Sequence, residues 1–179
     1  MSEPIVRIEG LSKRFGAVQA VDDVSLELEP AETVGLVGES GCGKSVTAMS
    51  IIRLVAKPGR IVGGSILFHD EGRTVDLASM PEPEIRKYRG SKISMIFQEP
   101  MTALNPLFTI GDQIAEVLEL KQGLTRQAAW TQAIQLLEDT GIPEPARRAS
   151  AYPHQLSGGQ RQRAMIAAAL ACRPKLLLA

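Results

Sequence analysis

One glycine-rich segment, Gly38–Ser45, constrains this chain more than any other feature of its sequence. Its letters, GESGCGKS, fit the phosphate-binding pattern G-x-x-x-x-G-K-[ST]. The run before it, Thr33–Val37, is apolar and partly β-branched, which predicts a buried strand. The residues after it, 45–56, carry apolar side chains at roughly helical spacing: Val46, Met49, Ile52 and Leu54. The sequence therefore predicts strand, glycine loop and helix in the order that a phosphate-binding loop requires.

The residue types in this segment suit a nucleoside triphosphate. Glycines let the backbone turn tightly and point its N–H groups inward as a nest for phosphate oxygens. The predicted helix adds the positive end of its dipole. Lys44 is expected to reach the β- and γ-phosphates, and the Ser45 hydroxyl is expected to hold Mg²⁺, which prefers oxygen ligands. A chance glycine-rich turn is the alternative.

The composition is that of an ordinary folded domain, with 44% hydrophobic and 22% charged residues in a chain of 179. Twenty basic residues balance 20 acidic ones, so we expect no nucleic-acid partner. No apolar stretch approaches the roughly 20 residues that span a bilayer. The first residues, Met1–Pro4, lack the basic and apolar segments of a signal peptide. We therefore expect the chain to stay in the cytosol.

The first half of the chain reads as strands. Apolar and polar residues alternate in 6–9 and 24–29, which predicts half-buried strands. Two other runs, Val34–Val37 and Ser94–Phe97, are almost continuously apolar, which is typical of strands covered by helices on both sides. The pattern predicts a mixed α/β sheet with an antiparallel extension.

A helical insertion is predicted after Phe97. Two segments have apolar residues at helical spacing, namely Ile110, Ile114, Val117 and Leu118, then Trp130, Ala133, Ile134 and Leu137. Gly141 and Pro143 should end the second helix. The proline-bearing entrance, Glu99–Pro106, and the exit, 143–153, are predicted to be hinges or contact loops.

A second glycine motif lies within Tyr152–Arg163, which reads YPHQLSGGQRQR. Ser157 is a predicted helix N-cap, and bare backbone donors at Gly158 and Gly159 would favour an anion. Taken alone, a serine and two glycines before a helix more often form only a cap.

The glycine loop, Gln98, the helical insertion and LSGGQ occur in an order that resembles ATP-binding-cassette (ABC) ATPases across essentially the whole chain. LSGGQ is similar to the signature motif of that family. The resemblance implies an α/β fold, a P-loop NTPase sheet with an N-terminal antiparallel β subdomain and a helical insertion, truncated at the C-terminus. It implies a nucleotide-binding core in 1–97, a Gln loop and helical subdomain in 98–156, and a signature helix with the start of the next strand in 157–179.

The same resemblance implies ATP and Mg²⁺ as ligands. Gln98 matches the glutamine that senses Mg²⁺ and nucleotide beside the membrane subunit, and only Lys44 and Gln98 are expected to be catalytic. Phe15 stands where such ATPases place an aromatic ring against adenine, with an ordinary turn aromatic as the alternative. The residues expected at the nucleotide are Phe15, Gly38, Glu39, Ser40, Gly41, Cys42, Gly43, Lys44, Ser45, Val46 and Gln98, with Leu156, Ser157, Gly158, Gly159 and Gln160 from the opposite protomer. Ser45 and Gln98 are expected at the metal.

The resemblance also implies partners. We expect a head-to-tail dimer with an identical or homologous protomer, bound to integral membrane permease subunits on the cytoplasmic face of a bacterial or archaeal membrane. FQEPMTALNP, residues 97–106, and YPHQLSGGQRQR are similar to the dipeptide and oligopeptide importer branch. Two residues depart from that pattern: Glu99 replaces a common aspartate, and Ala31 replaces a usual glycine. Ala31 would matter only if its turn needs a positive φ.

The last residues, Arg173–Ala179, are predicted to form an apolar strand that in this family leads into the Mg²⁺-anchoring aspartate and the water-polarising glutamate. Because neither is present, we expect a truncated cassette. The full-length subunit should hydrolyse ATP, whereas residues 1–179 should not do so at a comparable rate. Two alternatives stay open: a soluble ABC-type ATPase without a permease, and a non-hydrolytic nucleotide-binding module if the gene ends at Ala179. The absence of a heptad run between Lys44 and Leu156 favours the transport type.

Overall fold

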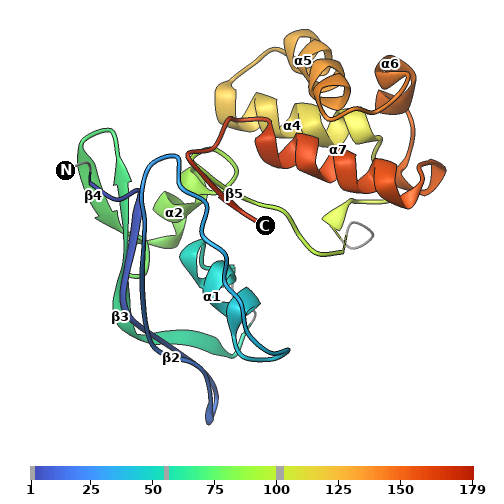
Figure 1. The fold of residues 1–179 in the computed structure, drawn as a ribbon. Coiled ribbons are helices and arrows are strands. Elements are labelled where there is room, and N and C mark those ends of the chain that lie inside the picture. The colour runs from blue at the N-terminus through green and yellow to red at the C-terminus, as the bar shows by residue number, and fades with distance from the viewer. Residues whose placement is uncertain (1–2, 55–56, 100–102) are drawn as a thin grey trace. The chain divides into compact units, whose positions relative to one another are not determined.

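The computed structural model describes residues 3–54, 57–99 and 103–179. The chain divides into two compact units, Met1–Arg86 and Lys87–Ala179. Strands predominate among the regular elements of the first unit, and helices predominate among those of the second (Figure 1). The glycine-rich segment therefore belongs to one unit, and Gln98 and LSGGQ belong to the other.

An antiparallel sheet forms the framework of the first unit. Its strands lie in the order β2-β1-β3-β4, with bounds β1 Val6–Phe15, β2 Val18–Leu28, β3 Gly59–Asp70 and β4 Arg73–Asp76. Val6 of the central strand β1 pairs with Leu28 on one side and Phe68 on the other. Val6 and Ile8 are buried while Glu9 is exposed, as a period of two requires. The predicted half-buried strands are confirmed.

The segment before the glycine loop differs from the prediction. No regular structure is assigned to residues 32–38, and neither sheet of the described structure includes them, so the predicted strand over Thr33–Val37 is wrong. Its side chains are also exposed, with 45% of Leu36 and 92% of Val37 accessible. A strand needs neighbours that pair its backbone N–H and C=O groups. Apolar sequence alone supplies no such neighbour.

The helix after the glycine loop, α1 (Lys44–Ile51), is shorter than predicted. Ile52 caps it, and Arg53 adopts a left-handed φ of 51°, which takes the chain out of the helix before Leu54. The predicted end, Ala56, lies outside the described residues. A second short helix, α2, spans Glu82–Tyr88.

A tight turn precedes the segment that leads to α1. The Glu32 N–H donates to the Glu29 carbonyl at 3.2 Å, and Ala31 between them has a φ of 61°. Non-glycine residues rarely adopt this left-handed conformation. The alanine therefore stands at a position where the backbone favours glycine.

The second unit is a helical bundle with a small sheet. Its helices are α4 Ile110–Gln122, α5 Arg126–Asp139, α6 Pro145–Ala149, the 3-10 turn η1 Pro153–Gln155, and α7 Gly158–Leu170. Helices α4, α5 and α7 pack together around one core (Figure 1), and each gives it apolar side chains, among them Ile114, Leu118, Ala133, Leu137, Ala164 and Ala167. The two predicted insertion helices are confirmed. None of the helices within the described ranges is long and apolar enough to cross a membrane.

The small sheet pairs β5 (Ile93–Met95) with β6 (Leu176–Leu178) in parallel. The Ile96 N–H still donates to the Leu178 carbonyl at 2.8 Å, but Phe97 is 40% exposed. The strand predicted over 94–97 therefore exists, but it begins and ends earlier and is not covered along its whole length.

Candidate functional site

The glycine loop is anchored to the sheet through Gly43. This residue has a φ of 96°, and a Cβ placed on it would lie 2.6 Å from the Ala20 carbonyl oxygen of β2. Real Cβ atoms do not approach a carbonyl this closely, so only glycine fits between the loop and the strand. Strand β2 therefore fixes where the loop ends and α1 begins.

Lys44 folds back over the same loop. Its Nζ donates to the Gly38 carbonyl at 2.8 Å and to the Glu39 carbonyl at 2.7 Å. Residues 38–42 are exposed, and the Lys44 side chain stays partly accessible. The positive charge therefore lies against an exposed backbone turn, where it can meet an anion.

The start of α1 has backbone donors that no side chain caps. Its N-cap is Gly43, and no cap hydrogen bond from a side chain of the described residues reaches it. The first N–H groups of a helix have no partner within the helix, and they carry the positive end of its dipole. These donors, Lys44 and the exposed Ser45 hydroxyl together fit a phosphate and its Mg²⁺. Within the described part of the chain, no cluster of acidic, His or Cys residues could hold a metal ion by itself.

Phe15, the predicted adenine contact, ends β1 and is half-buried. The Lys13 ammonium lies over its ring, 5.1 Å from the centroid. Sequence reasoning gave Lys13 no role. A signal was present, because Leu11, Lys13 and Phe15 follow a period of two, which places the lysine on the buried face of the strand.

LSGGQ forms the capped start of α7. The Ser157 Oγ accepts from the Gln160 N–H at 3.3 Å, and the Gln160 Oε1 accepts from the Ser157 N–H at 3.1 Å. This reciprocal pair is a capping box, so the predicted N-cap is confirmed. Gly158 and Gly159 are exposed, with open space where a Cβ would lie. Leu156 is only 2% exposed, and its N–H and carbonyl already bond to Pro153 and Arg161, so in this structure it offers little to a ligand.

Arg161 holds the turn before LSGGQ in place, a role that sequence reasoning missed. Its Nε donates to the Pro153 carbonyl at 2.8 Å and to the Leu156 carbonyl at 3.0 Å. Beside this turn, the rings of Tyr152 and His154 stack with centroids 5.7 Å apart. The signature is therefore presented by a turn with fixed backbone geometry.

Gln98 is exposed and follows β5. It and Ser45, the two predicted metal contacts, belong to different units, each described by itself. Of the predicted contact loop Glu99–Pro106, residues 100–102 lie outside the described residues. The structure therefore places Gln98 on an accessible segment and leaves its metal role a prediction.

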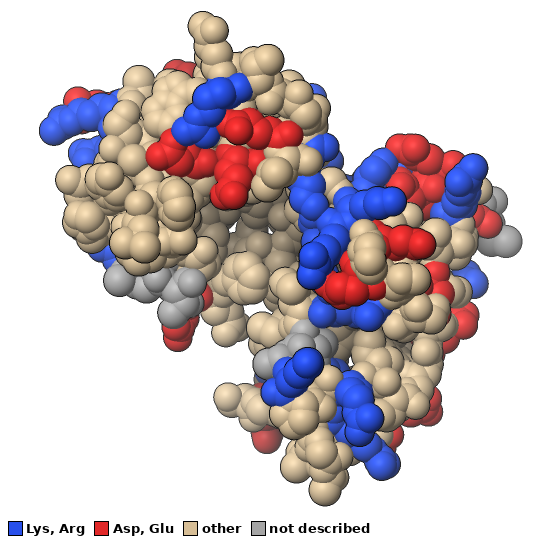
Figure 2. All heavy atoms as spheres, turned by 180° about the vertical axis from the view of Figure 1, so that it is seen from behind, with Lys and Arg blue, Asp and Glu red and all other residues tan. Residues whose placement is uncertain are grey.

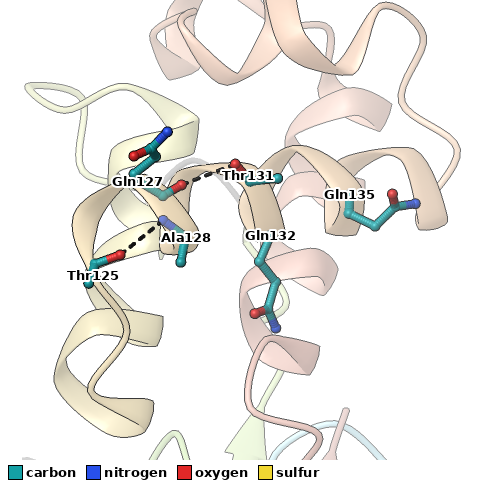
Figure 3. Close-up of a pocket in the computed structure, with 6 residues that line it drawn as sticks. All are labelled: Thr125, Gln127, Ala128, Thr131, Gln132 and Gln135. Atoms are coloured by element: carbon teal, nitrogen blue, oxygen red, sulfur yellow. Dashed lines mark hydrogen bonds between the residues drawn. The ribbon is translucent and has the colours of Figure 1, made fainter.

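An open hollow of about 610 Å³ lies on α5, but its lining does not have the groups expected for ATP. Figure 3 shows its lining, which comes from that helix and its cap: Thr125, Gln127, Ala128, Thr131, Gln132 and Gln135. The hydroxyls of Thr125 and Thr131 already bond to the backbone of the helix. Because no lining residue carries a positive charge, this surface suits a triphosphate less well than the glycine loop with Lys44, which remains the candidate site.

Relatives of the chain are named as peptide import or oligopeptide transport ATP-binding proteins. Residues 21–179 match the family model described as "ABC transporter". A protein of Brucella abortus (strain 2308) named as a peptide import ATP-binding protein is 53% identical over 183 residues, which cover 99% of this chain and 54% of the relative. The oligopeptide transport ATP-binding protein OppD of Haemophilus influenzae (strain ATCC 51907 / DSM 11121 / KW20 / Rd) is 45% identical over 180 residues, covering 98% and 54%. The chain therefore spans about half the length of these curated relatives.

A solved structure has the same fold. The dimeric, post-hydrolysis ATP-binding cassette MJ0796 bound to ADP and Pi matches with a TM-score of 0.81 and 28% identity, over 96% of this chain and 72% of that one. The predicted fold class, an α/β cassette with an antiparallel β part and a helical part, is confirmed. From its matched residues, its two glycine-bearing helix starts and its fold, this chain belongs to the ABC transporter family.

Proposed function

We propose that the full-length protein is the ATP-binding, energy-coupling subunit of an importer for dipeptides or oligopeptides. One observation carries the proposal: the same chain has an uncapped helix start beside Lys44 and a capped, exposed LSGGQ helix start. The first suits phosphate binding directly, and the second suits contact with a nucleotide held elsewhere. The names of the relatives support import of peptides.

In this proposal the first helix start holds the nucleotide. The Lys44 ammonium exchanges its bonds to the Gly38 and Glu39 carbonyls for bonds to the β- and γ-phosphates, and the N–H groups at the start of α1 hold the remaining oxygens. Ser45 and Gln98 would contact Mg²⁺, which neutralises charge on the phosphates when it is bound. Phe15 would stack against the adenine.

The second helix start acts on the partner's nucleotide. Two protomers pair head to tail with two ATP molecules between them, and the backbone donors of Gly158 and Gly159 reach the γ-phosphate held by the partner's Lys44. ATP binding closes this dimer, and hydrolysis reopens it. We also propose that the chain has three functional parts: a nucleotide-binding core in 1–97, a Gln loop and helical subdomain in 98–156, and a signature helix with the start of the next strand in 157–179.

Dimerisation tests this arrangement. We expect Mg²⁺ with a non-hydrolysable ATP analogue to convert the full-length protein into dimers in sedimentation velocity experiments. Gly158→Asp should abolish the dimer, because its carboxylate would meet the γ-phosphate, while the ATP affinity of the monomer stays unchanged. Gln162→Asp, at an exposed position of the same helix, is the matched control. A Gly158→Asp variant that dimerises like the control would contradict the proposal.

Hydrolysis separates an ATPase from a non-hydrolytic binding module. The full-length protein should release phosphate from ATP in steady state, and residues 1–179 alone should not do so at a comparable rate. Phosphate release at equal rates would contradict the assignment of the water-polarising group to the longer protein. No release by the full-length protein would favour the binding module.

The segment around Gln98 is proposed to pass the motion to a membrane permease. Leu107 and Phe108 lie just after the contact loop and are 79% and 54% exposed. Apolar side chains this exposed suit a protein interface. Changing both to Asp should abolish co-purification with candidate permease subunits. Leu120→Asp on α4, at a residue 73% exposed, should leave co-purification intact. Retention of the permease by the double variant would rule out this segment as the docking surface, and failure of the unaltered protein to co-purify with any permease would favour the soluble ATPase without a permease.

We propose that the subunit lies on the cytoplasmic face of the membrane, bound through its permease. Figure 2 shows acidic and basic side chains intermixed on the visible face, in agreement with the zero formal net charge. Such a surface offers no broad basic field for nucleic acid or anionic lipid. In membranes containing the complex, the subunit should be released by alkaline carbonate, whereas permease subunits remain. Uptake of labelled tripeptides into vesicles carrying the whole importer tests the solute.

A further inference from the structure

The first unit contains a buried lysine that the proposed ATP contacts do not use. Lys13 of β1 is 1% exposed, although lysine is almost never fully buried unless it is paired. Arg14, the next residue, points outward and is exposed. The burial of Lys13 thus follows from its place in the strand and is not shared by the neighbouring cation.

The partners of Lys13 come from α1 and from the aromatic residue two positions along the strand. Its Nζ donates to the Ser50 Oγ at 3.2 Å and lies 5.1 Å from the centroid of the Phe15 ring. The Ser50 Oγ in turn donates to the Val46 carbonyl at 2.6 Å. No carboxylate pairs with this ammonium among the residues that the structure describes.

Stability alone is a weak reason for this arrangement. An ammonium can donate three hydrogen bonds, but among the described residues it contacts only one hydroxyl, that of Ser50, and one ring face, that of Phe15. Burial lowers the pKa of Lys13 because the charged form loses its hydration. A methionine of similar length would fill the same space without this desolvation cost. The reason for a lysine at this position is therefore to be sought at the groups that it contacts, Phe15 and Ser50.

We propose that Lys13 is a positioning residue that holds the Phe15 ring ready for a purine base and connects that ring to α1. This inference rests on the proposed function, in which Phe15 stacks on the adenine of ATP. A cation over one face of an aromatic ring is held by the negative charge of that face and restricts where the ring can move. Phe15 is half-buried, so the residue is not closed off from solvent.

The contact with Ser50 extends the effect to the phosphate site. Ser50 lies in the helix that begins with Lys44, so the chain from Phe15 through Lys13 to Ser50 joins the base platform to the element that holds the phosphates. Fixing the two in advance lowers the entropy lost when one ligand must meet both. The site thereby favours a ligand whose base and triphosphate lie at one fixed distance from each other.

A comparison of two ligands tests this role in the full-length protein. Isothermal titration calorimetry would measure the affinity for MgATP and for Mg²⁺-tripolyphosphate, which has the phosphates without the base. Lys13→Met should weaken MgATP binding about 5- to 20-fold and leave tripolyphosphate binding unchanged. Lys87→Met, at an exposed lysine, should change neither affinity. A structural role alone would lower both affinities together.

A double-mutant cycle tests whether Lys13 affects MgATP binding through the Phe15 ring. Once Phe15→Leu has removed the platform, adding Lys13→Met should cause no further loss of MgATP affinity. Ser50→Ala should give a smaller loss restricted to MgATP, and it decides the question if Lys13→Met fails to fold. Equal losses for both ligands, or full additivity with Phe15→Leu, would overturn the inference. If the unaltered protein bound neither ligand, the proposed function itself would fail.

Discussion

The starts of α1 and α7 both contain glycines, but they differ in how their backbone donors are satisfied. At α7, Ser157 and Gln160 exchange two hydrogen bonds, and Arg161 holds the preceding turn. At α1 the N-cap is Gly43, and no side chain among the described residues caps the helix. Nearby, Lys44 bonds to the carbonyls of the loop instead.

The difference suggests two separate tasks. An uncapped start keeps its N–H groups for a ligand, so its geometry depends on packing against β2 through Gly43. A capped start keeps its shape without a ligand, so it can present Gly158 and Gly159 as a fixed surface. The first arrangement suits binding within one protomer, and the second suits contact made only when a partner brings the nucleotide.

The largest expected effect separates the two kinds of glycine. Gly43→Ala should lower the free energy of unfolding by about 3 kcal/mol, because the new Cβ meets the Ala20 carbonyl in a left-handed conformation. Gly158→Ala, with open space at its Cβ, should change stability by no more than about 0.5 kcal/mol. Urea denaturation of the nucleotide-free, full-length protein measures both. Equal destabilisation by the two substitutions would remove the distinction.

Loss of the loop cation should affect only the first helix start. Lys44→Met should weaken MgATP binding on the order of 100-fold, because charge-assisted hydrogen bonds to the phosphates are lost. Ser157→Ala should leave the MgATP affinity of the monomer unchanged, since α7 is proposed to act on the partner's nucleotide. Calorimetric titration below the concentration at which dimers form provides the measurement. A large loss of monomer affinity in Ser157→Ala would mean that the signature contacts its own nucleotide.

Removal of the Ser157 cap should lower the stability of the start of α7 and leave the start of α1 unaffected. Ser157→Ala should destabilise the protein by about 1 kcal/mol, because the N–H of Gln160 loses its acceptor. Ser157→Asp, which keeps an acceptor at the N-cap, is the matched variant and should recover most of that stability. Unchanged urea midpoints in Ser157→Ala would show that the capping box contributes nothing measurable.

The smallest expected change in stability is at the turn Glu29–Glu32, which precedes the segment that leads to α1. Ala31→Gly should stabilise the protein by about 0.5–1 kcal/mol, because glycine adopts the observed φ of 61° without strain. Ala128→Gly, on the exposed side of α5, should instead destabilise it by about 1 kcal/mol. Thermal unfolding of both variants checks the opposite signs. Destabilisation by Ala31→Gly would mean that the strain at this turn is relieved elsewhere.

The sequence determined the local chemistry of this protein. The motif GESGCGKS, the N-cap Ser157, the alternating strands around Val6 and the two insertion helices depend on patterns within a few residues, and the structure has them. Short-range hydrogen bonds and the periods of helices and strands fix such features. The family also followed from the order of these motifs.

Tertiary structure decided what depends on distant partners. Thr33–Val37 has the composition of a strand but forms none in the described structure, because strands are made by neighbours that pair with them. The φ of Ala31, the contact of Gly43 with Ala20 and the meeting of Lys13 with Ser50 likewise depend on where the backbone turns. The contact of the buried Lys13 with Ser50 exists because β1 and α1 pack together. Local sequence therefore supplied the candidate binding groups, and packing decided their surroundings.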